Sequence, residues 1–135
     1  MKSNWLNQAL RQWQNEGIAL NPPTTLTTIS HAEQKLIFTF PDSFKELYLA
    51  ADGFKDNAWR ENMFSIWPIE RILFEFIERK DSLFIGFSDY LINSHALGFY
   101  RGFDGIYKDV DRHFPVARSF EECINFINSD TSMIY

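Results

Sequence analysis

Two neighbouring residues, Ser94 and His95, are the strongest candidates for nucleophilic catalysis, because Asp89 lies only a few positions before them. A serine nucleophile needs a histidine base within hydrogen-bonding reach and a carboxylate that orients the imidazole. Neighbouring strand residues point to opposite faces of a sheet, so this serine and histidine are poorly placed to form a pair. The only cysteine, Cys123, falls on the apolar side of a predicted helix, where a buried thiol is expected. We therefore predict no catalytic residue and a chain that is not an enzyme.

Acidic residues in the second half of the chain suggest a cation site at Asp104, Asp109 and Asp111. An EF-hand loop would need glycine and glutamate at the positions that hold Phe114 and Phe120. The three histidines have no spacing typical of a metal site, and the glycines do not form a phosphate-binding loop. The sequence therefore predicts neither a metal nor a cofactor.

Large aromatic and charged residues gather between residues 54 and 62, in a stretch without helical or strand periodicity. Aromatic and arginine side chains are favoured anchors at protein interfaces. This stretch, read as an exposed loop, gives the first candidate partner-binding residues: Phe54, Asp56, Trp59 and Arg60. For Phe54 and Trp59 the alternative is burial against the core. A second candidate surface, for which the alternative is a set of solvated turn charges, comprises Asp89, Tyr90, Asp104 and Asp109.

Apolar residues recur at spacings of three and four in five segments, which predicts helices. The expected ranges are 4–16, about 30–36, 41–52, 69–79 and 119–128. Gly17 and Gly53 follow the first and third segments, as residues that readily adopt the left-handed conformation ending a helix. The second helix is expected to begin at Ser30 or at Thr28. Many β-branched and aromatic residues in the fourth segment leave a strand possible there.

Four further segments have the composition of short strands: 63–67, 83–88, 96–101 and 105–109. Helices come first, strands gather in the middle and a helix closes the chain. This order predicts an α+β fold with an antiparallel or mixed sheet and helices packed on it. A length of 135 residues is typical of one domain, so we expect a single domain over 1–135 in which 128–135 form a loose tail.

The chain carries 13 basic and 18 acidic residues, a net charge of −5, which is the wrong sign for a protein that binds nucleic acid through its phosphates. All of the negative surplus lies beyond Pro41, so the electric field favours a cationic protein partner. The sequence shows neither a signal peptide nor an apolar window long enough to cross a membrane. A single cysteine fits a reducing compartment. We therefore expect a cytoplasmic monomer or weak dimer with a protein partner and no nucleic acid, membrane or cofactor.

Several short motifs follow one another in a defined order: Leu20-Asn21-Pro22-Pro23, Ala32-Glu33 with Leu36, Pro41, Phe44-Lys45-Glu46-Leu47-Tyr48 and Asp52-Gly53. Later motifs are Trp67-Pro68-Ile69, Phe84-Ile85-Gly86-Phe87-Ser88-Asp89 and Ala117-Arg118-Ser119-Phe120-Glu121. Their order and spacing resemble the SUKH superfamily, also called the Smi/Knr family, over nearly the whole chain. One departure is Ile37, where the family more often has glycine.

This resemblance implies a cytoplasmic, non-enzymatic α+β protein of SUKH-like fold. Many bacterial members look like immunity proteins that neutralise a toxin, and fungal relatives are linked to the regulation of cell-wall synthesis. We therefore expect an immunity protein that binds and occludes a cationic toxin domain. The alternative is a regulatory or scaffolding interaction domain of the cell-wall-synthesis regulator type, because a fold does not by itself fix a function.

Overall fold

The computed structural model describes residues 3–135, which contain five α-helices, one short 3₁₀ helix and four strands. Along the chain these elements are α1 (Asn4–Asn15), α2 (Leu26–Leu36), α3 (Asp42–Tyr48), β1 (Phe64–Ile66), α4 (Ile69–Arg79), β2 (Phe84–Tyr90), β3 (His95–Tyr100), β4 (Ile106–Lys108), α5 (Phe120–Asn128) and η1 (Ser132–Ile134). Every predicted helix and strand is present, but α3 ends at Tyr48, four residues before the predicted end, so Gly53 does not end it. Residues 69–79, for which the composition leaves a strand possible, form a helix.

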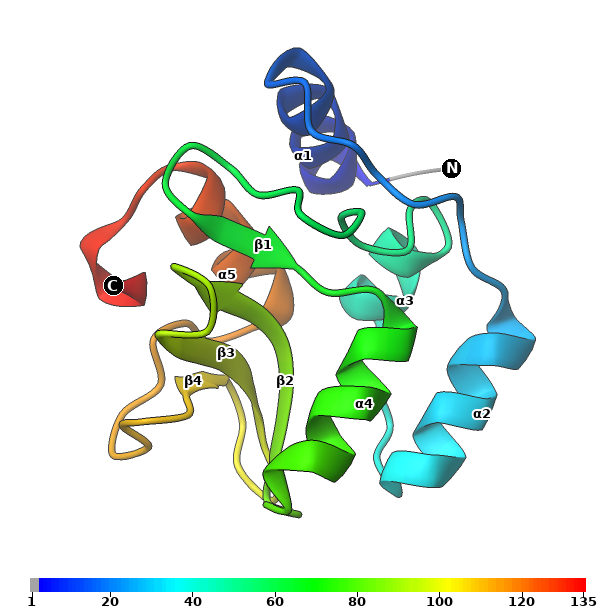
Figure 1. Cartoon of the computed structure of the whole chain (residues 1–135), viewed down its shortest axis with the longest axis vertical. Helices are drawn as coiled ribbons and strands as arrows, with labels where there is room; N and C mark the ends of the chain where they lie inside the picture. Colours follow the sequence, from blue (N-terminus) through cyan, green and yellow to red (C-terminus); the bar gives the residue numbers. More distant parts are fainter. Residues whose placement is uncertain (1–2) are drawn as a thin grey trace.

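The four strands form one antiparallel sheet in the order β1-β2-β3-β4, so the predicted α+β fold is confirmed in its antiparallel form. The central strands β2 and β3 are joined by a short turn, and a bulge lies between Gly86 and Ser88. In Figure 1, α5 lies behind the sheet, whereas α4 runs beside β2 with α2 alongside it. Helix α4 therefore stands between the sheet and α2.

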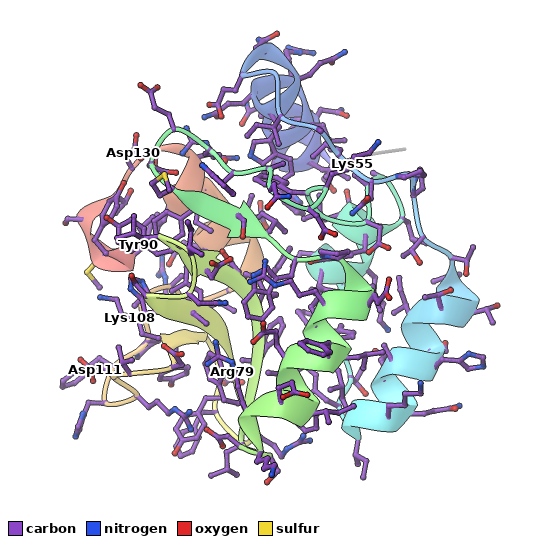
Figure 2. All side chains as sticks on the ribbon, in the orientation of Figure 1. Lys55, Arg79, Tyr90, Lys108, Asp111 and Asp130 are labelled. Carbon is purple, nitrogen blue, oxygen red and sulfur yellow. The ribbon has the colours of Figure 1, made fainter. Side chains whose placement is uncertain are left out.

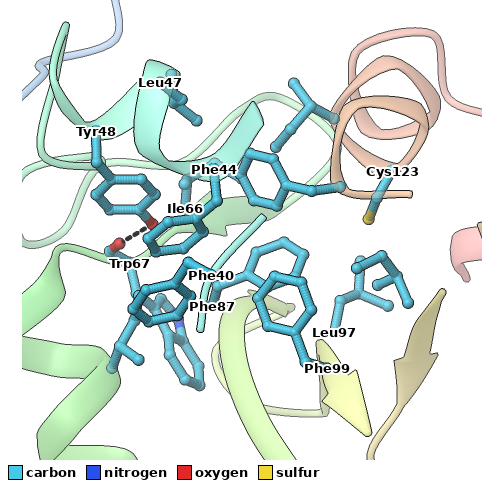
Figure 3. Close-up of a cluster of buried hydrophobic side chains, with 14 of the residues drawn as sticks. Phe40, Phe44, Leu47, Tyr48, Ile66, Trp67, Phe87, Leu97, Phe99 and Cys123 are labelled. Carbon is cyan, nitrogen blue, oxygen red and sulfur yellow. Dashed lines mark hydrogen bonds between the residues drawn. The ribbon is translucent and has the colours of Figure 1, made fainter. Parts of the chain in front are cut away.

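An aromatic core fills the space between the sheet and the helices α3 and α5 (Figure 3). Phe44 of α3 stacks on Phe40 with ring centroids 3.9 Å apart, and on Tyr48 at 4.1 Å. Phe120 of α5 meets Phe44 and Phe87 edge to face, at 5.3 and 4.9 Å. Burial of each large apolar side chain contributes about 1.5–3 kcal/mol, so this cluster holds both helices on the sheet.

The turn that follows α3 is locked against the residues that follow β1. The hydroxyl of Tyr48 donates to the carbonyl of Trp67 at 2.5 Å, and the first N–H of α4 donates to Oδ1 of Asp52 at 2.9 Å. Gly53 has a φ of 69°, and a Cβ at this position would lie 2.6 Å from the carbonyl carbon of Trp67. Glycine is therefore required here, and the start of α4 is fixed beside the loop after α3.

Helix α2 starts earlier than predicted and ends in a strained residue. The hydroxyl of Thr25 accepts a hydrogen bond from the N–H of Thr28 at 3.1 Å, so the helix begins at Leu26 and the predicted start at Ser30 or Thr28 is wrong. Ile37 ends the helix with a φ of 51° and is 83% exposed. This left-handed conformation favours glycine, which gives a physical reason for the glycine that the resembled family more often has at this position.

Replacing Ile37 with glycine is expected to raise the free energy of unfolding by about 0.5–1 kcal/mol. The left-handed conformation costs a residue with a side chain about 1–2 kcal/mol, and the greater flexibility of unfolded glycine offsets part of that gain. Little packing is lost, because the side chain is exposed. Urea denaturation of both proteins measures the difference, and a less stable variant would contradict the prediction.

Both outer edges of the sheet are covered by other parts of the chain. Along β1, backbone N–H groups of the loop 54–60 donate to the carbonyls of Phe64 and Ile66, at 2.9 and 2.8 Å. Along β4, Ile106 exchanges two backbone hydrogen bonds with residues 116–117, at 2.9 and 2.7 Å. The loop after α3 is therefore held as an extension of the sheet.

The C-terminal segment packs against the sheet, so the prediction of a loose tail over 128–135 is wrong. Ile134 is fully buried, and its carbonyl lies 2.9 Å from Nε2 of His95. Tyr135 packs edge to face on the rings of Phe64 and Tyr90. A single turn of 3₁₀ helix is too short to produce a periodic pattern, which is why the sequence did not reveal it.

Candidate functional site

The residues considered for nucleophilic catalysis are engaged by separate structural contacts. Ser94 Oγ donates to a carbonyl of its own turn at 3.1 Å. His95 Nε2 faces the C-terminal segment, 2.9 Å from a backbone carbonyl. The carboxylate of Asp89 accepts hydrogen bonds from the side chains of Ser65 and Trp67. These three groups therefore do not form a triad.

The other groups considered for chemistry, a thiol and two carboxylates, are also engaged within the fold. Cys123 is fully buried, and this burial raises the pKa of its thiol. Asp109 forms an ion pair with Arg79 at 2.6 Å, and Asp111 lies 3.1 Å from the ring of His113. Within residues 3–135, no three histidine, cysteine or acidic side chains come close enough to hold a metal ion.

The surface is hollowed between the loop that follows α3 and the turn between β2 and β3. This groove has a volume of about 350 Å³. It brings together residues from both predicted partner-binding surfaces, namely Phe54, Asp56, Trp59 and Asp89. Its lining also includes Met63, Arg71 and Ile92. Residues far apart in the sequence therefore form one concave site.

Two predicted partner-binding residues are buried beneath the groove or beside it. Phe54 is 2% exposed and meets Trp13 edge to face at 5.1 Å. Arg60 is 6% exposed, with Nε and Nη2 each 2.9 Å from the carboxylate of Glu16 and Nη1 2.6 Å from the carbonyl of Ile127. For Phe54 the alternative of burial against the core is confirmed. The prediction that Arg60 lies in an exposed loop is wrong, because its ion pair with Glu16 holds it inward.

Asp89 is also buried, where it supports the groove from below. Its carboxylate accepts hydrogen bonds from the hydroxyl of Ser65, from the indole N–H of Trp67 at 2.7 Å and from the backbone N–H of Asn93 at 2.8 Å. Arg71 lies 3.6 Å away and stacks on Trp67, 4.5 Å from the ring centroid. The prediction that Asp89 lies on an exposed surface is therefore wrong. The carboxylate instead ties the turn after β2 to the start of α4.

The remaining residues of the second predicted surface do not line the groove. Tyr90 packs on Phe64 with ring centroids 5.0 Å apart, Asp109 pairs with Arg79, and Asp104 is exposed in the turn after β3. Tyr90 lies toward the C-terminal segment, whereas Arg79 lies toward the end of α4 (Figure 2). These residues therefore do not form one continuous surface.

Three exposed apolar side chains stand at the rim of the groove or next to it. Trp59 is 40% exposed, Ile92 is 71% exposed and Leu91 is 45% exposed. Trp59 was predicted from the sequence as a partner-binding residue, whereas Leu91 and Ile92 were not. The sequence did contain an indication of this pair. Leu91 and Ile92 occupy a short connection between strands, where polar residues and glycine are usual.

Backbone strain is concentrated around the groove. The described part of the chain has eight non-glycine residues with positive φ, and five are found here: Asn57, Met63, Leu91, Ile92 and Asn93. Ile92, with a φ of 52°, is a β-branched residue and so is poorly suited to this conformation. Such residues cost about 1–3 kcal/mol each and cluster at functional sites. The backbone N–H of Leu91 donates to the carbonyl of Met63 at 3.0 Å, which helps to hold the turn in place.

Comparisons with known proteins bear on the identity of the chain. No curated protein matches it. In the described residues, no helix combines the length and the apolar character needed to cross a membrane. The model of the SMI1 / KNR4 family (SUKH-1) matches residues 23–125, a range that contains Gly53, the groove and all four strands. The chain therefore belongs to the SMI1 / KNR4 family (SUKH-1).

Proposed function

We propose that this chain is a non-enzymatic protein-binding domain of the immunity type, which neutralises a cognate toxin by binding and occluding it. Family membership supports the general class. The observation that carries the proposal is the strained groove, at which Trp59 and Ile92 remain exposed. Large aromatic and aliphatic side chains beside a concave surface are typical of anchors at protein interfaces.

Ile92 is unfavourable in the free protein for two separate reasons. Its left-handed backbone conformation is strained, and most of its apolar side chain faces water. A partner that covers the side chain would recover roughly 25 cal/mol for each Å² removed from water. Strained residues of this kind are common at functional sites, which supports a binding role for Ile92.

The charge of the chain favours a cationic partner. The net charge is −5, and Asp56 is exposed at the rim of the groove. Complementary charge raises the association rate and rejects partners of the wrong sign, whereas burial of apolar anchors supplies affinity. We therefore assign steering to the acidic surface and affinity to the side chains at the groove.

Replacing Ile92 with glycine is expected to stabilise the chain while weakening partner binding. Relief of the left-handed strain should raise the free energy of unfolding by about 0.5–1 kcal/mol. Loss of the anchor should cost about 2 kcal/mol of binding, or roughly 30-fold in Kd. Urea denaturation and calorimetric titration measure the two effects.

Ile37→Gly is the matched control, because it removes the same side chain from the same conformation at a site outside the groove. It should gain stability and bind normally. Equal partner affinity in wild type, Ile92→Gly and Ile37→Gly would contradict the groove as the binding site.

The partner is obtained by affinity capture from cells that make the chain, and its own activity is then assayed. An immunity protein should abolish a toxic activity at one-to-one stoichiometry and restore growth of cells that produce the partner. Restoration should weaken with Ile92→Gly and not with Ile37→Gly. A captured partner that stays active in the complex would support the regulatory alternative instead.

A further inference from the structure

A second hollow continues from the groove toward the start of α4. It has a volume of about 650 Å³ and is more open than the groove. Lys55, Asp56 and Pro68 line both hollows, so the two are adjacent parts of one trough. The far end of the trough is formed by residues 21–24, together with Asp52 and Glu70. Figure 2 shows Lys55 on the loop between α3 and β1.

The two halves of the trough differ in chemistry. The groove carries the exposed apolar side chains of Trp59 and Ile92. The second hollow carries three carboxylates, from Asp52, Asp56 and Glu70, against the single ammonium group of Lys55. Within residues 3–135, none of these three carboxylates lies in an ion pair.

The walls of the second hollow are fixed by hydrogen bonds. The backbone N–H of Asn21 donates to the carbonyl of Gly53 at 3.0 Å, and that of Asp52 donates to the carbonyl of Pro22 at 3.2 Å. The side-chain amide of Asn21 donates to the carbonyl of Asp52 at 3.0 Å. A site held in this way loses little freedom when a ligand binds.

The carboxylates also disfavour one another. The pKa of Asp52 is raised by burial and, more weakly, by the charge of Glu70, while the hydrogen bond from the first N–H of α4 opposes these effects. A positive charge placed in the hollow would relieve this repulsion. The acidic half of the trough is therefore complementary to a cation.

We propose that the trough binds an extended segment of the partner, which seats an apolar side chain between Trp59 and Ile92 and places a lysine or arginine a few residues away in the hollow of Asp52, Asp56 and Glu70. This inference rests on the proposed function, because it takes the groove as the partner-binding site. It adds which types of residue the bound segment of the partner should carry.

Charge decides against a second copy of this chain as the occupant. The chain has a net charge of −5, so two copies repel each other at long range. A cationic segment is attracted to the same surface, and its apolar residue finds a concave site beside two exposed apolar side chains. Both halves of the trough are then occupied by complementary groups.

The test uses the full chain, immobilised, and a phage-displayed library of random peptides of about nine residues, which span about 30 Å when extended. Selected peptides should pair an aliphatic or aromatic residue with a nearby lysine or arginine. The double variant Asp56→Asn/Glu70→Gln should keep the apolar preference and lose the cationic one. Its affinity for a synthetic copy of a selected peptide should fall about tenfold at low salt.

Glu78→Gln is the control for the loss of one carboxylate from the same helix, because Glu78 is exposed and lies outside the trough. It should select and bind the same peptides as wild type. Asp52 is left unchanged in all variants, because its carboxylate caps α4.

Two kinds of failure can be told apart. Apolar peptides without enrichment of lysine or arginine, or equal affinity for wild type and the double variant, would overturn the cationic half while leaving the groove as a binding site. Failure to select any peptide, or peptides whose binding is insensitive to Ile92→Gly, would overturn the inference and also count against the groove itself.

Discussion

Replacing Gly53 with alanine is expected to destabilise the chain by about 2–5 kcal/mol. Two costs add up at this position. The left-handed conformation, with a φ of 69°, costs alanine about 1–2 kcal/mol of stability. Its Cβ would lie 2.6–2.7 Å from backbone atoms of Trp67 and Pro68, and backbone cannot move aside as a flexible side chain can. Overpacking of this kind costs a further 1–3 kcal/mol, roughly, and the displaced residues lie directly before α4.

Gly102→Ala separates the two costs. Gly102 has a φ of 88°, and nothing lies within 4 Å of the position that its Cβ would take. This variant should therefore lose only about 1–2 kcal/mol, through strain alone. Urea denaturation measures the free energy of unfolding of both variants. The comparison requires that this free energy depend on urea concentration with the same slope in each. A Gly53→Ala protein that is no less stable than Gly102→Ala would show that the loop after α3 is not locked against the residues that follow β1.

Replacing Arg60 with alanine is expected to cost about 3 kcal/mol of stability. Arg60 is 6% exposed, and its guanidinium joins the end of α1 to the end of α5 through the carboxylate of Glu16 and the carbonyl of Ile127. Removing one partner of a buried charged network leaves the other groups without a partner in a poorly solvated place. The variant also loses the packing of the arginine stem.

The stability lost in Arg60→Ala should become smaller at low pH. The hydrogen bonds from Arg60 lower the pKa of Glu16 below its ordinary value of 4.5 in the folded chain. A lowered carboxyl pKa contributes stability above the unfolded value, and that contribution is lost as the pH falls through the folded value. The gap in unfolding free energy between wild type and Arg60→Ala should therefore narrow below about pH 4.5.

Arg118→Ala is the control for this experiment. Arg118 also pairs with a glutamate, Glu122, at 3.1 Å, but its side chain is 88% exposed, so its removal should change stability by less than about 0.5 kcal/mol. If Arg60→Ala kept full stability and lost partner binding, Arg60 would be an interface residue, as its place in the sequence predicts.

Periodic patterns of apolar residues were sufficient to predict most of the fold. The faces of α3 and α5, including Phe44 and Phe120, are buried as their spacing predicts. Helix boundaries that depend on a single hydrogen bond were harder to predict, because either Thr25 or a later residue could cap α2. Asp89 was predicted to lie beyond its strand, whereas β2 extends through Tyr90. Pairing with β1 extends the strand, and this long-range contact leaves no local pattern.

The candidate site was less accessible to sequence reasoning for two physical reasons. Its groove depends on contacts between residues more than twenty positions apart, such as Trp67 with Asp89. Its most exposed apolar residue, Ile92, adopts a conformation that its own side chain disfavours. Local preference and final structure conflict at this residue, and such conflicts are expected at functional positions. Burial of Arg60 was equally hidden, because the pairing with Glu16 bridges distant segments.

The covered edges of the sheet limit how this chain can recognise another protein. A partner that bound by adding a strand would first have to displace the loop 54–60 from β1 or residues 116–117 from β4. The same shielding removes a template on which identical chains could stack into fibrils. Recognition then falls to side chains on turns such as the one that holds Leu91 and Ile92. These can be exchanged during evolution without altering the backbone ladder, so relatives with one scaffold could come to accept different partners.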